Sequence, residues 1–217
     1  MKKKFMAGLA MGLLVVGLAG VANANLVTNG SFEIGNYKTT FSSDFNTLAT
    51  GNAAIDNWSI TAGTVDWKNS YWKARDGKKS LDMSGLSLGT ISTTFATVIG
   101  AQYDVSFDMA GNTDGGPTTK TLKALVGDQS QVFTFDTVGL SRINMGWRNN
   151  AFSFTASDIS TTLSFRDLSI NDSGGNFYGA ALDNVIVNAS PVPEPATMML
   201  FGVGIAGLAG FVRRKKI

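Results

Sequence analysis

The sequence predicts an all-β fold, a jelly-roll β-sandwich, flanked by an N-terminal signal helix and a C-terminal transmembrane helix. The middle of the chain is rich in Gly, Ser, Thr, Asn, Asp and aromatic residues, and Glu33 is its only glutamate. Apolar and polar residues alternate there over short stretches, which is typical of strands. Turn residues separate these stretches. No segment of ten or more residues within this part of the chain has the 3.6-residue period of a helix.

Residues 1–24 have the three parts of a secretory signal peptide. Lysines at positions 2, 3 and 4 precede an apolar run from Phe5 to Val21, and the small residues Ala22 and Ala24 follow. This pattern predicts cleavage after Ala24. A retained N-terminal membrane anchor is the alternative.

The domain expected over residues 25–190 contains about nine strands. The clearest alternation places Tyr103, Val105, Phe107 and Met109 on one face of a strand. The expected strands cover residues 58–60, 80–83, 89–97, 103–109, 119–126, 131–136, 151–155, 161–165 and 180–188. Many short strands with regular turns favour a sandwich or jelly roll, which pairs two sheets and protects most strand edges. A β-helix is the main alternative, but the sequence has no fixed repeat.

Charge and composition exclude several classes of function. Residues 25–192 hold 11 Lys and Arg against 15 Asp and Glu, so the domain has a net charge of −4, although the whole chain is formally +2. An acidic domain without a basic face is not expected to bind nucleic acid. The chain has no His and no Cys, which excludes Ser-His-Asp and Cys-His nucleophiles and Cys/His zinc sites.

The C-terminal end has three parts. Residues 191–195 are proline-rich, residues 196–212 carry no charge, and residues 213–217 are basic. A helix over the uncharged residues would be about 25 Å long, close to the thickness of a bilayer core. Because basic residues stay on the cytoplasmic side, the domain is expected outside the cytoplasm. A buried core helix is the alternative.

Pro193, Glu194 and Pro195, then the apolar run, then a basic end that includes Arg213 and Arg214, resemble the PEP-CTERM sorting signal of Gram-negative bacteria. The resemblance implies an exosortase-type membrane protease as partner. It also implies a protein held transiently in the membrane and finally placed at the cell surface or in the extracellular matrix. A C-terminal anchor that is never cut is the alternative.

Residues 25–33, 56–58 and 181–187 resemble the choice-of-anchor C family of PEP-CTERM proteins. More distantly, they resemble DUF642 proteins of plant cell walls and carbohydrate-binding modules with a galactose-binding-like jelly roll. In such modules the first and last strands often share a structural Ca²⁺ ion. The matching positions are Glu33 and Asp183, with the turn at Asn29 supplying carbonyl oxygens. Alternatively, Glu33 accepts backbone amides or pairs with a basic neighbour.

Exposed aromatic rings that stack on sugars are the expected means of carbohydrate binding. The main candidates are Trp67, Tyr71 and Trp72, and further candidates are Trp147 and Tyr178. In a straight strand Trp67 and Trp72 would face opposite sides, so Tyr71 would join Trp67. Packing of these rings in the core or at its rim is the alternative.

The sequence therefore favours a non-enzymatic surface or matrix protein that binds extracellular polysaccharide. A structural or adhesive module that binds protein partners or itself is one alternative. A glycoside hydrolase or lyase is another, because glycoside hydrolysis requires only two carboxyl groups. Most of the aspartates lie at turns, where they usually cap backbone amides, and no catalytic residue can be assigned.

Overall fold

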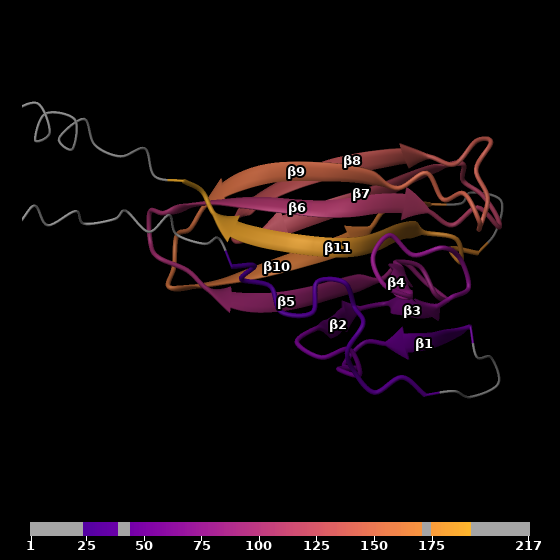
Figure 1. Cartoon of the computed structure of the whole chain (residues 1–217), viewed down its shortest axis with the longest axis horizontal. Coiled ribbons are helices and arrows are strands. Elements are labelled where there is room, and N and C mark those ends of the chain that lie inside the picture. The colour runs from indigo at the N-terminus through magenta and orange to yellow at the C-terminus, as the bar shows by residue number, and fades with distance from the viewer. Residues whose placement is uncertain (1–23, 39–43, 171–174, 192–217) are drawn as a thin grey trace, which may run out of the picture.

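The computed structural model of the chain describes residues 24–38, 44–170 and 175–191. Its described part contains two antiparallel sheets packed face to face, which confirms the predicted all-β sandwich (Figure 1). The six-stranded sheet has the order β1 (Phe45–Ala49), β3 (Thr64–Asn69), β4 (Lys79–Asp82), β11 (Ala180–Ala189), β6 (Gln102–Gly111) and β9 (Arg148–Thr155). The five-stranded sheet has the order β2 (Ser59–Ala62), β5 (Thr90–Ala96), β10 (Ser160–Asp167), β7 (Thr119–Val126) and β8 (Gln129–Asp136).

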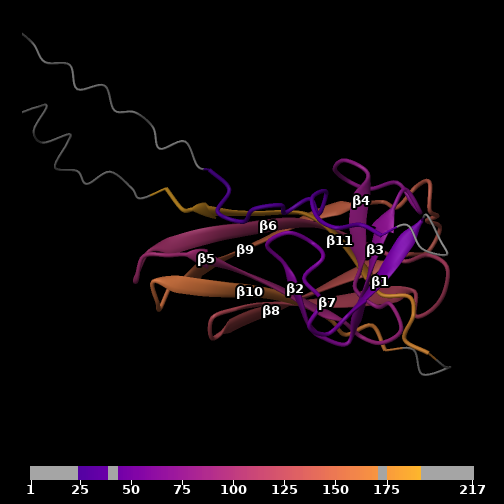
Figure 2. The same ribbon diagram turned by 90° about the horizontal axis from the view of Figure 1, so that it is seen from below.

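The core lies between the two sheets, which Figure 2 shows as separate layers, with β6 and β11 in one and β7, β8 and β10 in the other. Alternation along β6 sends Tyr103, Val105, Phe107 and Met109 inward, as expected, and all four are buried. Phe107 meets Phe165 of the opposite sheet, with ring centroids 4.9 Å apart in an edge-to-face arrangement. Such pairs add to the stability that apolar burial provides.

The N-terminal segment of the domain lies along β11, near the other end of the sequence. Leu26 donates its amide to the carbonyl of Val187 at 2.8 Å, and Val185 donates to the carbonyl of Gly30 at 2.9 Å. A Cβ atom at Gly30 would lie 1.9 Å from the Val185 carbonyl oxygen, so this close backbone approach requires glycine.

Each of the nine expected strands corresponds to a strand of the structure, with shifts of a few residues at the ends. β1 and β3 were not predicted. Within β3, Val65 and Trp67 do alternate with the polar Asp66 and Lys68, but all four are buried. The strand ends before Ser70, whose φ of +61° breaks the extended backbone.

Among the described residues there is no helix long and apolar enough to cross a membrane. The expected signal segment before Ala24 and the expected membrane segment, residues 196–212, lie outside those residues. So do Ala22, Pro193, Glu194, Pro195, Arg213 and Arg214. Ala24 itself is exposed.

Candidate functional site

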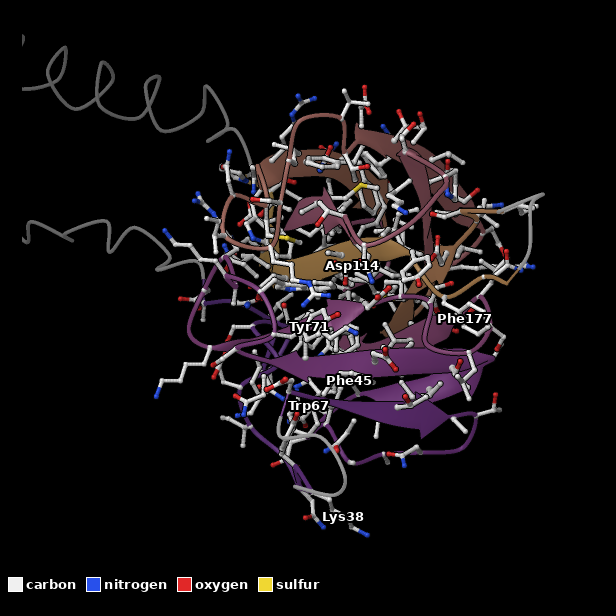
Figure 3. The ribbon with its side chains drawn as sticks, turned by 90° about the vertical axis from the view of Figure 1, so that its right-hand side faces the viewer. Lys38, Phe45, Trp67, Tyr71, Asp114 and Phe177 are labelled. Carbon is white, nitrogen blue, oxygen red and sulfur yellow. The ribbon has the colours of Figure 1, made fainter. Side chains whose placement is uncertain are left out.

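Loops and strand ends gather at one end of the sandwich, which faces the viewer in Figure 3. They enclose a pocket of about 180 Å³, called here the end pocket. Four aromatic residues line it: Phe45, Tyr71, Phe177 and Tyr178. Phe177 is 44% exposed, so its ring is the one most open to solvent.

A buried cation lies against the wall of this pocket. Lys68 Nζ is 2.9 Å from Asp66 Oδ2 and 3.8 Å from Asp82 Oδ2, and its side chain is only 4% exposed. It also lies 4.0 Å from the ring centroid of Phe45 and 4.5 Å from that of Tyr71. The ammonium is therefore compensated by two carboxylates and by aromatic faces, as a buried charge requires.

Asp82 is fully buried beside this lysine. Burial raises the pKa of its carboxyl to about 7; the charge of Lys68 opposes this increase, and the charge of Asp66 adds to it. Its two oxygens accept hydrogen bonds from Asn112 Nδ2 at 2.6 Å and from the amide of Ser84 at 3.1 Å. Asp82 is therefore part of the support beneath the pocket rather than a group that a ligand can reach.

Tyr71, Asp114 and Arg142 form one wall of the site, and Figure 3 labels the first two. The phenol of Tyr71 donates to Asp114 Oδ2 at 2.7 Å, and Arg142 Nε donates to Asp114 Oδ1 at 2.7 Å. Burial and the bond to Asp114 raise the pKa of Tyr71 to about 12. Burial also acts to raise the pKa of Asp114, but the bonds from Arg142 and Tyr71 hold it below its ordinary value. Asp114 thus stays ionised as an acceptor at the pocket.

Residues 70–79, called here the 70–79 loop, carry Tyr71 and are held by two carboxylates. Glu33 Oε1 accepts from the amides of Lys78 and Lys79 at 2.8 and 2.5 Å. Asp183 Oδ2 accepts from the amides of residues 75 and 76 at 2.8 and 3.0 Å. The two acidic positions of the sequence motifs therefore position the loop that forms the site.

These contacts bear on the expected calcium site. Asn29 uses its side chain for the backbone: Oδ1 accepts from the amide of Ile34, and Nδ2 donates to the carbonyls of Ile34 and Asp56. No group of three or more acidic residues able to hold a metal ion occurs within the described residues. Backbone amides already occupy Glu33 Oε1 and Asp183 Oδ2, so the observed contacts favour loop anchoring over the predicted calcium shell.

The predicted sugar-stacking residues are distributed between the pocket and the core. Tyr71 and Tyr178 line the end pocket. Trp67 and Trp72 do not; Trp67 is fully buried and Trp72 is 3% exposed, so the prediction that their rings face a sugar is wrong. Their indole nitrogens donate to internal acceptors, the carbonyl of Phe32 and the hydroxyl of Ser80. The turn at Ser70 explains why Tyr71 does not share the buried face of Trp67. β3 ends before this turn, so Tyr71 no longer follows the alternation of the strand.

Trp147 lies outside the end pocket and is half-buried. Its indole nitrogen donates to the carbonyl of Lys73 at 2.9 Å, which ties the 70–79 loop to the segment before β9. Sequence reasoning missed Phe45 and Asp114. Both come from segments whose meeting with the 70–79 loop depends on long-range pairing, so no local pattern marks them, whereas Tyr71 and Tyr178 belong to local aromatic clusters.

Comparison with known proteins gives one curated relative. The chain is 31% identical to Halomucin of Haloquadratum walsbyi (strain DSM 16790 / HBSQ001) over 189 aligned residues. The aligned region covers 85% of this chain. The chain spans 2% of the length of Halomucin.

Solved structures similar to the chain include three carbohydrate-binding modules. TmCBM61 in complex with β-1,4-galactotriose has 14% sequence identity and a TM-score of 0.46, covering 77% of this chain and 99% of that one. A family 16 carbohydrate-binding module has 13% identity and a TM-score of 0.44, with coverages of 75% and 99%. CBM35 from Paenibacillus barcinonensis has 16% identity and a TM-score of 0.41, with coverages of 67% and 99%.

Two family models match the chain. Residues 191–216 match the PEP-CTERM protein-sorting motif, as the order of proline-rich, apolar and basic parts predicted. Residues 25–188, which contain both sheets and the end pocket, match the model described as protein of unknown function, DUF642. The chain therefore belongs to the DUF642 family and carries a PEP-CTERM sorting motif.

Proposed function

We propose that this protein is an exported, non-catalytic surface or matrix protein that binds extracellular polysaccharide through the end pocket. The observation that carries the proposal is the composition of that pocket, where aromatic rings stand beside carboxylate and amide side chains. Aromatic faces pack on the apolar faces of sugars, and carboxylates and amides bind hydroxyl groups. Phe177 is the expected stacking ring, with Asp114 as the hydroxyl partner, because the amide of Asn112 is buried and bonded to Asp82 and to the backbone of Asp114.

The PEP-CTERM motif supports the surface location in this proposal. An exosortase-type membrane protease would recognise Pro193, Glu194 and Pro195 while residues 196–212 hold the chain in the membrane. Basic residues at 213–217 would keep that end on the cytoplasmic side. The intact mass of the protein recovered from its host tests this part: a chain that ends near Pro195 is expected, and one that retains Arg213 and Arg214 would contradict processing.

The surroundings of the acidic residues favour binding over hydrolysis. Glycoside hydrolysis needs an acid of raised pKa and a second carboxylate that both face the substrate. Asp82 has the raised pKa but is fully buried and hydrogen-bonded to Asn112. We therefore expect the protein to bind polysaccharides without releasing fragments; fragment release that Asp82→Asn abolishes would contradict this.

Phe177→Ala tests the pocket directly. A glycan array with the full-length protein in mild detergent identifies a ligand, and calorimetry then gives its affinity. Loss of a stacked ring is expected to weaken binding by at least about ten-fold. Ile159→Ala is the matched control, because Ile159 is also an exposed apolar side chain far from the pocket. Its carbonyl accepts from the amide of Thr97, just after β5, and the arrowhead of β5 lies at the end of the sandwich away from β1 and β3 (Figure 1). Equal affinity of Phe177→Ala and wild type would overturn the assignment of the pocket.

A further inference from the structure

A second hollow shares Tyr71 with the end pocket. It has a volume of about 500 Å³ and lies between the 70–79 loop and residues 142–143. Four of its lining residues are basic and exposed: Lys73, Arg75, Lys78 and Arg142. No acidic residue lines it among the described residues. This hollow is called here the basic groove.

The basic groove stands out against the charge of the rest of the domain. Residues 25–192 carry a net charge of −4, yet four of their 11 basic residues line this one hollow. A domain of negative net charge repels anions at long range. A local concentration of cations in a hollow reverses that effect and creates a site where an anion is stabilised.

The arginines of the groove are oriented by buried or half-buried carboxylates. Asp108, which is 1% exposed, pairs with Arg75 Nε at 3.4 Å, and Asp114 pairs with Arg142 Nε at 2.7 Å. The two arginine side chains remain 55% and 48% exposed. Each pair engages Nε, so it fixes the direction of the guanidinium while about half of the side chain stays open to solvent.

The two lysines are less constrained by the protein. Lys73 and Lys78 are exposed, and neither forms an ion pair within the described part of the chain. Their backbones are fixed, however, because the amide of Lys73 donates to the carbonyl of Arg142 at 2.9 Å and that of Lys78 donates to Glu33 at 2.8 Å. A fixed backbone reduces the ordering that binding would cost.

We propose that the basic groove binds an anionic substituent, a carboxylate or a sulfate, of the polysaccharide that occupies the end pocket. Guanidinium and ammonium groups form charge-assisted hydrogen bonds with such groups. Tyr71 lines both hollows, and its ring lies 4.1 Å from Arg142 Cζ, so one sugar chain can reach both. This inference rests on the proposed function and narrows it to acidic polysaccharides.

Matched pairs of polymers test the inference with the full-length protein in mild detergent. Polygalacturonate is compared with its carboxyl-reduced form, and dextran sulfate with dextran, by calorimetry at low and at physiological salt. We expect at least one acidic polymer to bind more tightly than its neutral partner, and salt to weaken that binding because it screens exposed charges. The pair that shows the difference identifies the carboxylate or the sulfate.

The double variant Lys73→Gln, Lys78→Gln is expected to lose about ten-fold in affinity for the acidic polymer, since exposed ion pairs are individually weak. Lys123→Gln with Arg166→Gln is the control, because it removes the same charge from neighbouring positions on the five-stranded sheet. An equal loss in both variants would show only long-range attraction and would overturn the proposal that the basic groove binds the anionic substituent.

Equal binding of acidic and neutral polymers would also overturn that proposal while leaving the proposed function intact. Absence of binding by all four polymers would count against both.

Discussion

The phenol of Tyr71 donates a hydrogen bond to the carboxylate of Asp114, with the two oxygens 2.7 Å apart. Tyr71 belongs to the 70–79 loop, and Asp114 belongs to the loop between β6 and β7. Arg142 binds the other oxygen of the same carboxylate, so three loops converge on one group. This bond therefore fixes the wall that separates the aromatic end pocket from the basic groove.

Tyr71→Phe is expected to lower the free energy of unfolding by about 1 kcal/mol, because it removes one partly exposed hydrogen bond to a charged group and keeps the ring. Urea denaturation measures the change. Tyr178→Phe is the matched control: the structure shows no hydrogen bond from the Tyr178 phenol to any described residue, so no comparable loss is expected. Equal destabilisation by the two variants would show that the Asp114 bond adds nothing specific.

Lys68→Met is expected to destabilise the domain by about 3–5 kcal/mol, because it leaves Asp66 and Asp82 buried without their cation. Methionine keeps much of the length and apolar stem of lysine, so packing against Phe45 is largely retained. Thermal and urea unfolding measure the loss.

The double variant Lys68→Met, Asp66→Asn provides the control for that interpretation. Asp66 Oδ2 is the closest partner of Lys68, at 2.9 Å, and an amide in its place removes one uncompensated charge. We expect part of the stability to return. If the double variant is as unstable as the sum of the single changes, the two residues do not act as a pair.

Glu33→Ala is expected to loosen the 70–79 loop and weaken polysaccharide binding, whereas Glu33→Gln is expected to bind nearly as wild type. The amide of glutamine retains an oxygen that can accept from Lys78 and Lys79, as Glu33 Oε1 does. Calorimetric affinities of the three proteins make the comparison.

The same pair of variants separates loop anchoring from calcium binding. A Ca²⁺ site depends on carboxylate charge, so Glu33→Gln would then be as impaired as Glu33→Ala, and a chelator would reproduce the effect on the wild type. The observed amide bonds instead lead us to expect no chelator effect on affinity.

The sequence was a good guide where one face of a strand is apolar and the other polar. β6 is the clear case, because its alternation runs through Phe107 and Met109 without interruption. β3 was missed because the aromatic residues from Trp67 onward look like one continuous surface segment. In the structure the strand ends at Asn69, because the backbone of Ser70 has a left-handed conformation. A positive φ at serine is uncommon and leaves no clear mark in the sequence.

The candidate site was predictable only in part, for a related reason. Tyr71 and Tyr178 could be identified as members of aromatic clusters, but their meeting depends on strand pairing across more than 100 positions. Asp114 and Arg142 carried no local indication at all, because a turn aspartate and a surface arginine are common in any β-sandwich. Glu33 and Asp183 were identified from their motifs, yet their contacts with loop amides emerge only from the fold.

Mild acidification is expected to stabilise the domain. Burial raises the pKa of Asp82 to about 7, and burial likewise raises that of Asp183 to about 7. In the unfolded chain an aspartate has a pKa of about 3.9. Between these values the folded state holds more protons than the unfolded state, so the free energy of unfolding falls as the pH rises. The stabilisation is complete below about pH 4 and is lost as the pH passes about 7.

Calorimetric melting at about pH 5.5 and about pH 8 measures the effect, which linkage puts on the order of 1–3 kcal/mol for Asp82. Asp82→Asn places an uncharged group at the same position and is expected to flatten the pH dependence, and Asp183→Asn should flatten it further. Asp114 has a lowered pKa, so its contribution is lost only at lower pH and does not obscure this interval. A melting temperature that rises from pH 5.5 to pH 8 would contradict the raised pKa values of Asp82 and Asp183.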